Sequence, residues 1–250
     1  MSDTQDADIE ERFYEPTWNL LDSVWAGWGR IDPEYHSPRY QSRIFPAEIW
    51  NNMGINEAEP ASVEHPSFRV IRRQYGVLAT SYGLSFPIAW SDADPTNGVE
   101  VEVFAAATGT DFAEMPTADV LSSWLGQMVR AVTENWSSGG FSFTNALQNY
   151  GTLTITLPGV RLPAEAAADY LDDNGNPTVL LGVTDPGLPE RVDGPLSPIR
   201  LVGIKLLTRA ETEYCVSGTT GVGDARTELT RRLDEQGEVI WSSLTRPSVV

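Results

Sequence analysis

The sequence is poor in the residues that most often carry out chemistry. Its 250 residues include one cysteine, Cys215, and two histidines, His36 and His65. A single cysteine cannot form an internal disulfide bond. A zinc site needs three or four clustered ligands, whereas these three residues are widely spaced along the chain. We therefore expect no metal, no cofactor, and no catalytic role for Cys215 or either histidine.

Long apolar runs are also missing. No stretch approaches the roughly 20 apolar residues that a membrane-spanning helix requires. The first residues, MSDTQDADIEERFYE, are acidic and polar, whereas a signal peptide has a basic end followed by an apolar stretch. These features predict a soluble, cytoplasmic protein.

Positive charge is the third shortage. Lysine and arginine together number 17, against 35 aspartates and glutamates, which gives a formal net charge of -18. Lys205 is the only lysine. Because so acidic a chain is repelled by phosphate backbones and anionic lipids, we expect neither nucleic acid nor a membrane surface as its partner. The acidity serves either solubility or the attraction of a basic partner protein.

The remaining sequence has the patterns of a folded α+β protein. Residues 117–136 carry one broad apolar stripe at helical spacing, and Thr17 is a plausible N-cap of an earlier helix. Further helices are expected at residues 46–53, after the capping box at Thr208 and after Asp224. Strands are expected at residues 68–75, 77–82, 99–103, 152–157, 178–183 and 199–207.

These elements show no regular alternation of strand and helix. We therefore predict a single α+β domain over residues 15–250, with a mixed, largely antiparallel sheet flanked by helices. Residues 1–14 are predicted to form an acidic, mobile tail.

The distribution of charge suggests a binding surface. Residues 74–129 contain no lysine, arginine or histidine. The alternation in VEVEV, residues 99–103, places the valines toward a core and the two glutamates on the opposite face. We predict that Asp92, Asp94, Glu100 and Glu102 contribute to a face that engages a basic partner protein. An ordinary solvated face explains the same pattern.

Two other classes of function remain open. The acid-rich segment 92–119, with Glu100, Glu102 and Asp111, would serve a metal-dependent hydrolase if it bound a divalent ion. A purely structural subunit is the third class, and the sequence leaves the oligomeric state undetermined.

Several segments, taken in order, resemble the Suppressor of fused domain family. The first is YGVLATSYGLS, residues 75–85, which is similar to a family strand that ends in a turn containing glycine, a hydrophobic residue and serine. As in the family, a strand near Glu100 (VEVEVF) and a long helix carrying Trp124 follow.

The second segment is IRLVGIKLLTRAETEY, residues 199–214, which resembles a late family strand leading into an acid-containing helix start. A glycine-bearing segment and the helix of Leu229 and Leu233 follow, and RPSV at residues 246–249 is similar to family endings. The resemblance extends from about Trp18 to the last residue.

The resemblance implies an α+β domain that binds protein and has no enzymatic activity. Animal members restrain transcription factors, and bacterial members are associated with toxin systems as immunity proteins. Sixteen arginines beside one lysine are typical of a GC-rich bacterial genome. We therefore expect a bacterial immunity-type protein that binds and inhibits a toxin or another basic protein.

Overall fold

The computed structural model describes residues 3–33, 68–90, 93–217, 221–237 and 239–250. Its helices are α1 (Asp3–Trp28), α3 (Thr110–Glu114), α4 (Thr117–Ser122), α5 (Trp124–Gly139), α6 (Phe141–Tyr150), α7 (Ala167–Tyr170), α8 (Arg209–Ser217) and α9 (Val222–Glu235). Its strands are β1 (Arg30–Ile31), β2 (Phe68–Arg73), β3 (Gly76–Ser81), β4 (Pro87–Ile88), β5 (Thr96–Asn97), β6 (Val101–Thr108), β7 (Leu153–Thr156), β8 (Thr178–Val183), β9 (Arg191–Asp193), β10 (Pro198–Leu206) and β11 (Trp241–Ser242).

The strands form one large sheet and one small one. In the large sheet the order is β1-β2-β3-β6-β10-β8-β7, with β11 paired to β6 and β9 paired to β10. Strands β10 and β11 run parallel to β6, whereas the other pairs described in this sheet are antiparallel. The small sheet pairs β4 with β5. The prediction of an α+β fold with a mixed, largely antiparallel sheet flanked by helices is confirmed.

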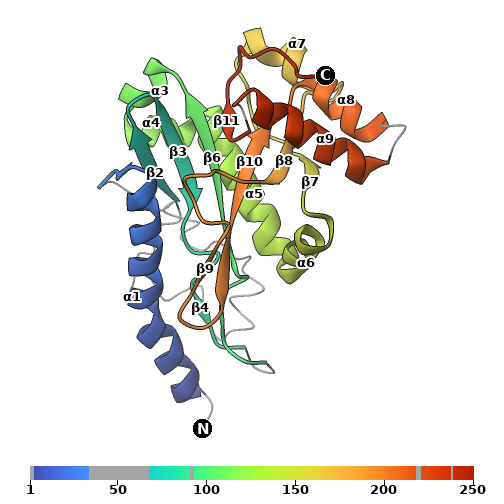
Figure 1. Cartoon of the computed structure of the whole chain (residues 1–250). Helices are drawn as coiled ribbons and strands as arrows, with labels where there is room; N and C mark the ends of the chain where they lie inside the picture. The colour runs from blue at the N-terminus through green and yellow to red at the C-terminus, as the bar shows by residue number, and fades with distance from the viewer. Residues whose placement is uncertain (1–2, 34–67, 91–92, 218–220, 238) are drawn as a thin grey trace.

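Helices cover both faces of the large sheet (Figure 1). On one face, α5 packs on β3 and β6 and α4 packs on β2, around a core that includes Val103, Leu125 and Met128. On the other face, a second core lies beneath α1, α8 and α9, and these helices contribute Leu21, Trp25, Trp28, Cys215, Leu229 and Leu233. Strand β6 is therefore buried from both sides, and its first seven residues are all buried.

The apolar stripe of residues 117–136 is core, as the sequence predicts, but it lies on two helices. Ser123, between α4 and α5, has the extended backbone angles φ -68° and ψ 172°, and its hydroxyl accepts a hydrogen bond from the N–H of Leu125. Gly126 lies so close to α4 that an added Cβ would come within 2.3 Å of the carbonyl oxygen of Leu121. The absence of a side chain at Gly126 thus lets the two helices pack closely.

The first helix starts earlier than the sequence suggests. We expected an acidic tail over residues 1–14 and an N-cap at Thr17, whereas α1 begins at Asp3 and has Thr17 in its interior. The hydroxyl of Thr17 donates to the carbonyl of Phe13 (2.8 Å). Pro16 is tolerated inside the helix because it lies on the solvent-exposed side, where water can bond the carbonyl that loses its partner.

The remaining predicted strands overlap observed ones, whereas the helix expected after Asp224 begins earlier, at Val222, so that Asp224 lies in the first turn of α9 and is not its N-cap. The strand predicted at residues 178–183 is β8, and the one predicted at residues 199–207 is β10, in the middle of the sheet. The helix expected at residues 46–53, together with His36 and His65, lies outside the described residues.

Candidate functional site

Glu102 does not face solvent, so the prediction that it belongs to an exposed acidic face is wrong. Its side chain is completely buried in β6. The carboxylate accepts hydrogen bonds from the N–H of Gly83 (2.9 Å), the N–H of Ser85 (3.0 Å), the Ser85 hydroxyl (2.7 Å) and the Ser81 hydroxyl. Alternation of apolar and polar residues indicates a solvent-exposed face only when one side of the strand is open to solvent. Both sides of β6 are covered.

This carboxylate is instead a structural anchor for the turn after β3. Burial raises the pKa of Glu102, and the hydrogen bonds from Ser81, Gly83 and Ser85 lower it by less, so the pKa lies above its ordinary value. The glycine and serine of the turn that resembles the Suppressor of fused family, Gly83 and Ser85, are thus the donors to Glu102.

Asp94 and Glu100 flank β5 and keep access to solvent. Asp94 is exposed in the loop between β4 and β5, and Glu100 is half-buried between β5 and β6. Glu100 has a positive φ of 61°, and its N–H donates to the carbonyl of Asn97 (2.8 Å). Asp92, the remaining predicted contact residue, lies outside the described residues. The structure therefore leaves Asp94 and Glu100 as candidates for a partner-binding surface.

Asn97 positions this region, a role that the sequence analysis did not reveal. Its fully buried side chain donates to the hydroxyl of Thr17 (2.8 Å) and to the carbonyl of Ser85 (3.1 Å). Its amide oxygen accepts from the N–H groups of Leu196 (2.9 Å) and Ser197 (3.1 Å). Asn97 thereby fixes β5 to α1, to the turn after β3 and to the loop before β10.

The N-terminal half of α1 lies beside β4 (Figure 1) and adds carboxylates to this region. A carboxylate oxygen of Glu10 accepts from the N–H of Ala89, next to β4 (3.4 Å). Glu11 and Glu15 are exposed on the solvent side of the helix, and Arg12 is the only cation in α1. We refer to Glu10, Glu11, Glu15, Asp94 and Glu100 as the α1–β5 surface.

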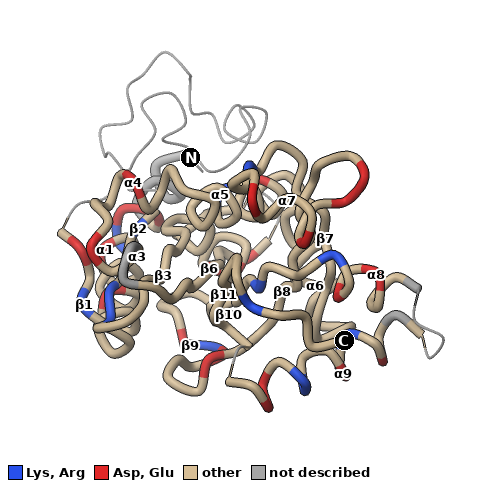
Figure 2. The backbone as a smooth tube through the Cα atoms, turned by 90° about the horizontal axis from the view of Figure 1, so that it is seen from above, with Lys and Arg blue, Asp and Glu red and all other residues tan. Residues whose placement is uncertain are grey.

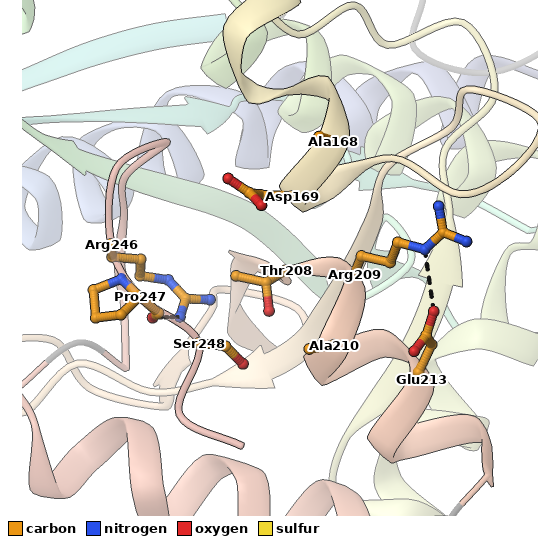
Figure 3. Close-up of a pocket in the computed structure, with 9 residues that line it drawn as sticks. All are labelled: Ala168, Asp169, Thr208, Arg209, Ala210, Glu213, Arg246, Pro247 and Ser248. Carbon is orange, nitrogen blue, oxygen red and sulfur yellow. Dashed lines mark hydrogen bonds and ion pairs between the residues drawn. The ribbon is translucent and has the colours of Figure 1, made fainter.

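A second feature is a cavity of about 420 Å³ between α7, the start of α8 and the C-terminal segment (Figure 3). Arg246, one of its lining residues, donates through two nitrogens to Glu211, whose side chain is fully buried. Glu211 also accepts from the N–H groups of Thr208 (2.9 Å) and Val249 (3.1 Å). The capping box predicted at Thr208 is confirmed, because the Thr208 hydroxyl accepts from the N–H of Glu211 (3.2 Å).

Of the three residues considered for catalysis in the sequence, Cys215, His36 and His65, only Cys215 lies in the described part of the chain. Cys215 is fully buried in α8, and burial raises the pKa of its thiol to about 11, with the Arg226 charge acting in the opposite direction. Within the described ranges no group of three or more histidine, cysteine, aspartate or glutamate side chains lies close enough to hold a metal ion. No helix in the described part of the chain has the length and apolar character to cross a membrane.

Comparison with known proteins identifies the fold. No family model and no curated protein matches the sequence. The crystal structure of Drosophila Suppressor of Fused is similar at 14% identity and a TM-score of 0.48, and the match covers 75% of this chain but only 44% of that chain. A chain of the Sufu–Fu complex crystal structure is similar at 13% identity and a TM-score of 0.55, over 95% of this chain and 92% of that one. The second match extends over nearly the whole length of both chains, so this protein has a Suppressor-of-fused-like fold.

Proposed function

We propose that this chain is a non-catalytic protein-binding domain and that its partner is a basic protein. In its most specific form, the proposal is that the chain is a bacterial immunity-type protein that binds and inhibits a toxin. The α1–β5 surface carries this proposal, because its exposed carboxylates outnumber the single arginine of α1.

The distribution of arginines adds support. Arg69 pairs with Asp22, and Arg72 donates to Asp32 (2.7 Å), so both are held by the protein itself. Both of these arginines are therefore neutralised internally, while the net charge of -18 remains; the acidic and basic positions along the chain are coloured in Figure 2. A basic protein would be attracted to such a surface, and the effect would act mainly on its association rate.

The fold supports a protein partner in general. The similar Sufu–Fu structure is that of a complex. By analogy we assign to this chain the role of a binding domain. The acidic surface favours a basic partner, and the arginine-rich, lysine-poor composition, typical of a GC-rich bacterial genome, favours the bacterial role in which that partner is a toxin.

The test is a binding measurement on two charge-reversed double variants. The partner is first captured from the native cell and identified, and its association rate is then measured at several salt concentrations. Asp94→Lys/Glu100→Lys should slow association at least about tenfold, and added salt should slow the wild-type protein in the same direction.

The control is Glu165→Lys/Asp234→Lys, which makes the same charge change at exposed positions in the helical turn before α7 and in α9. The control should associate at nearly the wild-type rate if the α1–β5 surface is the binding face. Equal slowing in both variants would show that only the net charge matters and that the α1–β5 surface is not the binding face. An association rate that changes neither with salt nor in either variant would refute the proposal. Inhibition by one chain per partner is the result expected if the partner is a toxin.

A further inference from the structure

A second cavity adjoins the one beside α8. The second cavity, of about 180 Å³, is lined by the loop after α7, by Thr178 and by α8. Both cavities share Arg209 and Glu213 as lining residues, so they lie on either side of these two side chains. We call the two together the α8 groove.

The walls of the α8 groove are predominantly acidic. The carboxylates lining it are Asp169, Asp172, Asp173 and Glu213. Arg246 also reaches it, but that guanidinium is bound by the buried carboxylate of Glu211 and adds no net charge. Arg209 is the remaining cation in the lining, so carboxylates exceed cations by three.

The groove already holds one guanidinium group. Arg209 donates from Nη2 to Asp173 (2.7 Å) and from Nε to Glu213 (3.1 Å), and the second contact is drawn in Figure 3. These side chains remain accessible: 42% of the Arg209 side chain and 86% of the Asp173 side chain are exposed. Asp169 lines the cavity from α7, and within the described part of the chain its carboxylate makes no hydrogen bond or ion pair (Figure 3).

We propose that the α8 groove is a docking site for an arginine-bearing, extended segment of a partner protein. Its acidic walls complement that segment, and the contacts of Arg209 show how a guanidinium is held here. The partner's arginine engages Asp169 in the open cavity and competes with Arg209 for Asp173 and Glu213. This deepens the proposed function, on which it rests for the basic character of the partner.

The first experiment uses a short fluorescent peptide with two arginines separated by glycine, and the same peptide with neutral citrulline in place of arginine. The arginine peptide should bind the intact protein, and citrulline should abolish the binding. Asp169→Asn/Asp173→Asn/Glu213→Gln should weaken binding at least about tenfold. The matched control Glu165→Gln/Asp224→Asn/Asp234→Asn removes the same charge from exposed positions outside the groove and should bind as wild type does.

A further variant, Arg209→Met, should change the affinity for the arginine peptide in the opposite direction. Arg209→Met removes the resident cation, so the arginine peptide should bind about twofold to fivefold tighter. A purely structural role for Arg209 would leave affinity unchanged or lower it. Equal losses in the groove and control variants, equal binding of the citrulline peptide, or preference for an acidic peptide would each overturn the inference.

The two proposals can fail separately. The variant Asp94→Lys/Glu100→Lys should leave peptide binding to the groove within about twofold of wild type. If the whole partner responds to that variant but the peptide does not bind, the groove proposal is wrong and the protein-binding function stands. If the peptide binds the groove but the captured partner is neither basic nor sensitive to salt, the proposed function is wrong.

Discussion

Arg246→Met should destabilise the protein strongly. The substitution removes the cation from a carboxylate, Glu211, that is fully buried and keeps only the N–H groups of Thr208 and Val249 as donors. Removing one member of a buried ion pair costs about 3–5 kcal/mol, because the remaining charge has no counterion. In a chain of this size that corresponds to a fall in melting temperature of roughly 6–20 °C.

The measurement is chemical denaturation monitored by tryptophan fluorescence, with scanning calorimetry beside it. The matched control is Arg209→Met, which removes an arginine from an exposed ion pair on α8, the helix that carries Glu211. This variant should change the denaturation midpoint little. The double variant Glu211→Met/Arg246→Met should recover much of the loss, since an apolar pair leaves no buried charge. A loss below about 1 kcal/mol for Arg246→Met would refute the reasoning.

The same pair has a pH signature. Burial raises the pKa of Glu211, but the hydrogen bonds and charge of Arg246 and the N–H groups of Thr208 and Val249 lower it further, so the pKa lies below its ordinary value of 4.5. A depressed folded-state pKa means that the unfolded chain binds the proton more tightly. The stabilisation is present above pH 4.5 and is lost as the pH falls through the folded-state value. Denaturation midpoints across acidic pH should show this loss in wild type and a weaker one in Arg246→Met.

Three further outcomes are expected. Trp124→Ala should lower the free energy of unfolding by on the order of 3–5 kcal/mol, because Trp124 is 7% exposed and packs edge-on against Phe112 with ring centroids 5.5 Å apart. A loss under about 1 kcal/mol, measured by denaturant unfolding, would place α5 at the surface. Cys215 should resist alkylation in the native state, because burial raises its pKa to about 11, and rapid modification near neutral pH would contradict its placement. Glu102→Ala should lower the free energy of unfolding by about 3 kcal/mol or more, since it leaves buried N–H groups at Gly83 and Ser85 without an acceptor, and a neutral effect would show that the turn forms without it.

Local patterns in the sequence predicted much of the secondary structure. The strict alternation at residues 152–157 contains β7, and the apolar run at residues 178–183 coincides with β8. Both signals are carried by the residues of the strand itself, because β-branched and apolar side chains favour the extended backbone wherever the strand is placed.

Pairing and helix boundaries were harder to predict, because they depend on distant residues. The parallel pairing of β6 with β10 joins Val101 to Arg200, and no local pattern specifies that contact. The break between α4 and α5 is fixed by the close approach of Gly126 to Leu121, and the length of α1 by its packing on the sheet and on β4. The α8 groove likewise combines residues from α7 and the segment after it, from α8 and from the C-terminal segment, so no short motif reveals it.

The two buried glutamates show most directly what the sequence leaves undetermined. Glu102 and Glu211 are both fully buried, and each accepts hydrogen bonds from backbone N–H groups. Glu102 has hydroxyl and N–H donors but no cation among them, and its pKa is raised, whereas Glu211 has Arg246 and its pKa is lowered. Their contributions to stability therefore change in opposite directions with pH: that of Glu102 declines as the pH rises above 4.5, and that of Glu211 declines as the pH falls below it. The difference depends on Arg246, which lies 35 residues from Glu211 in the sequence. Whether a glutamate lies at the surface, anchors a turn or forms a buried ion pair can therefore be decided only once its partners are known.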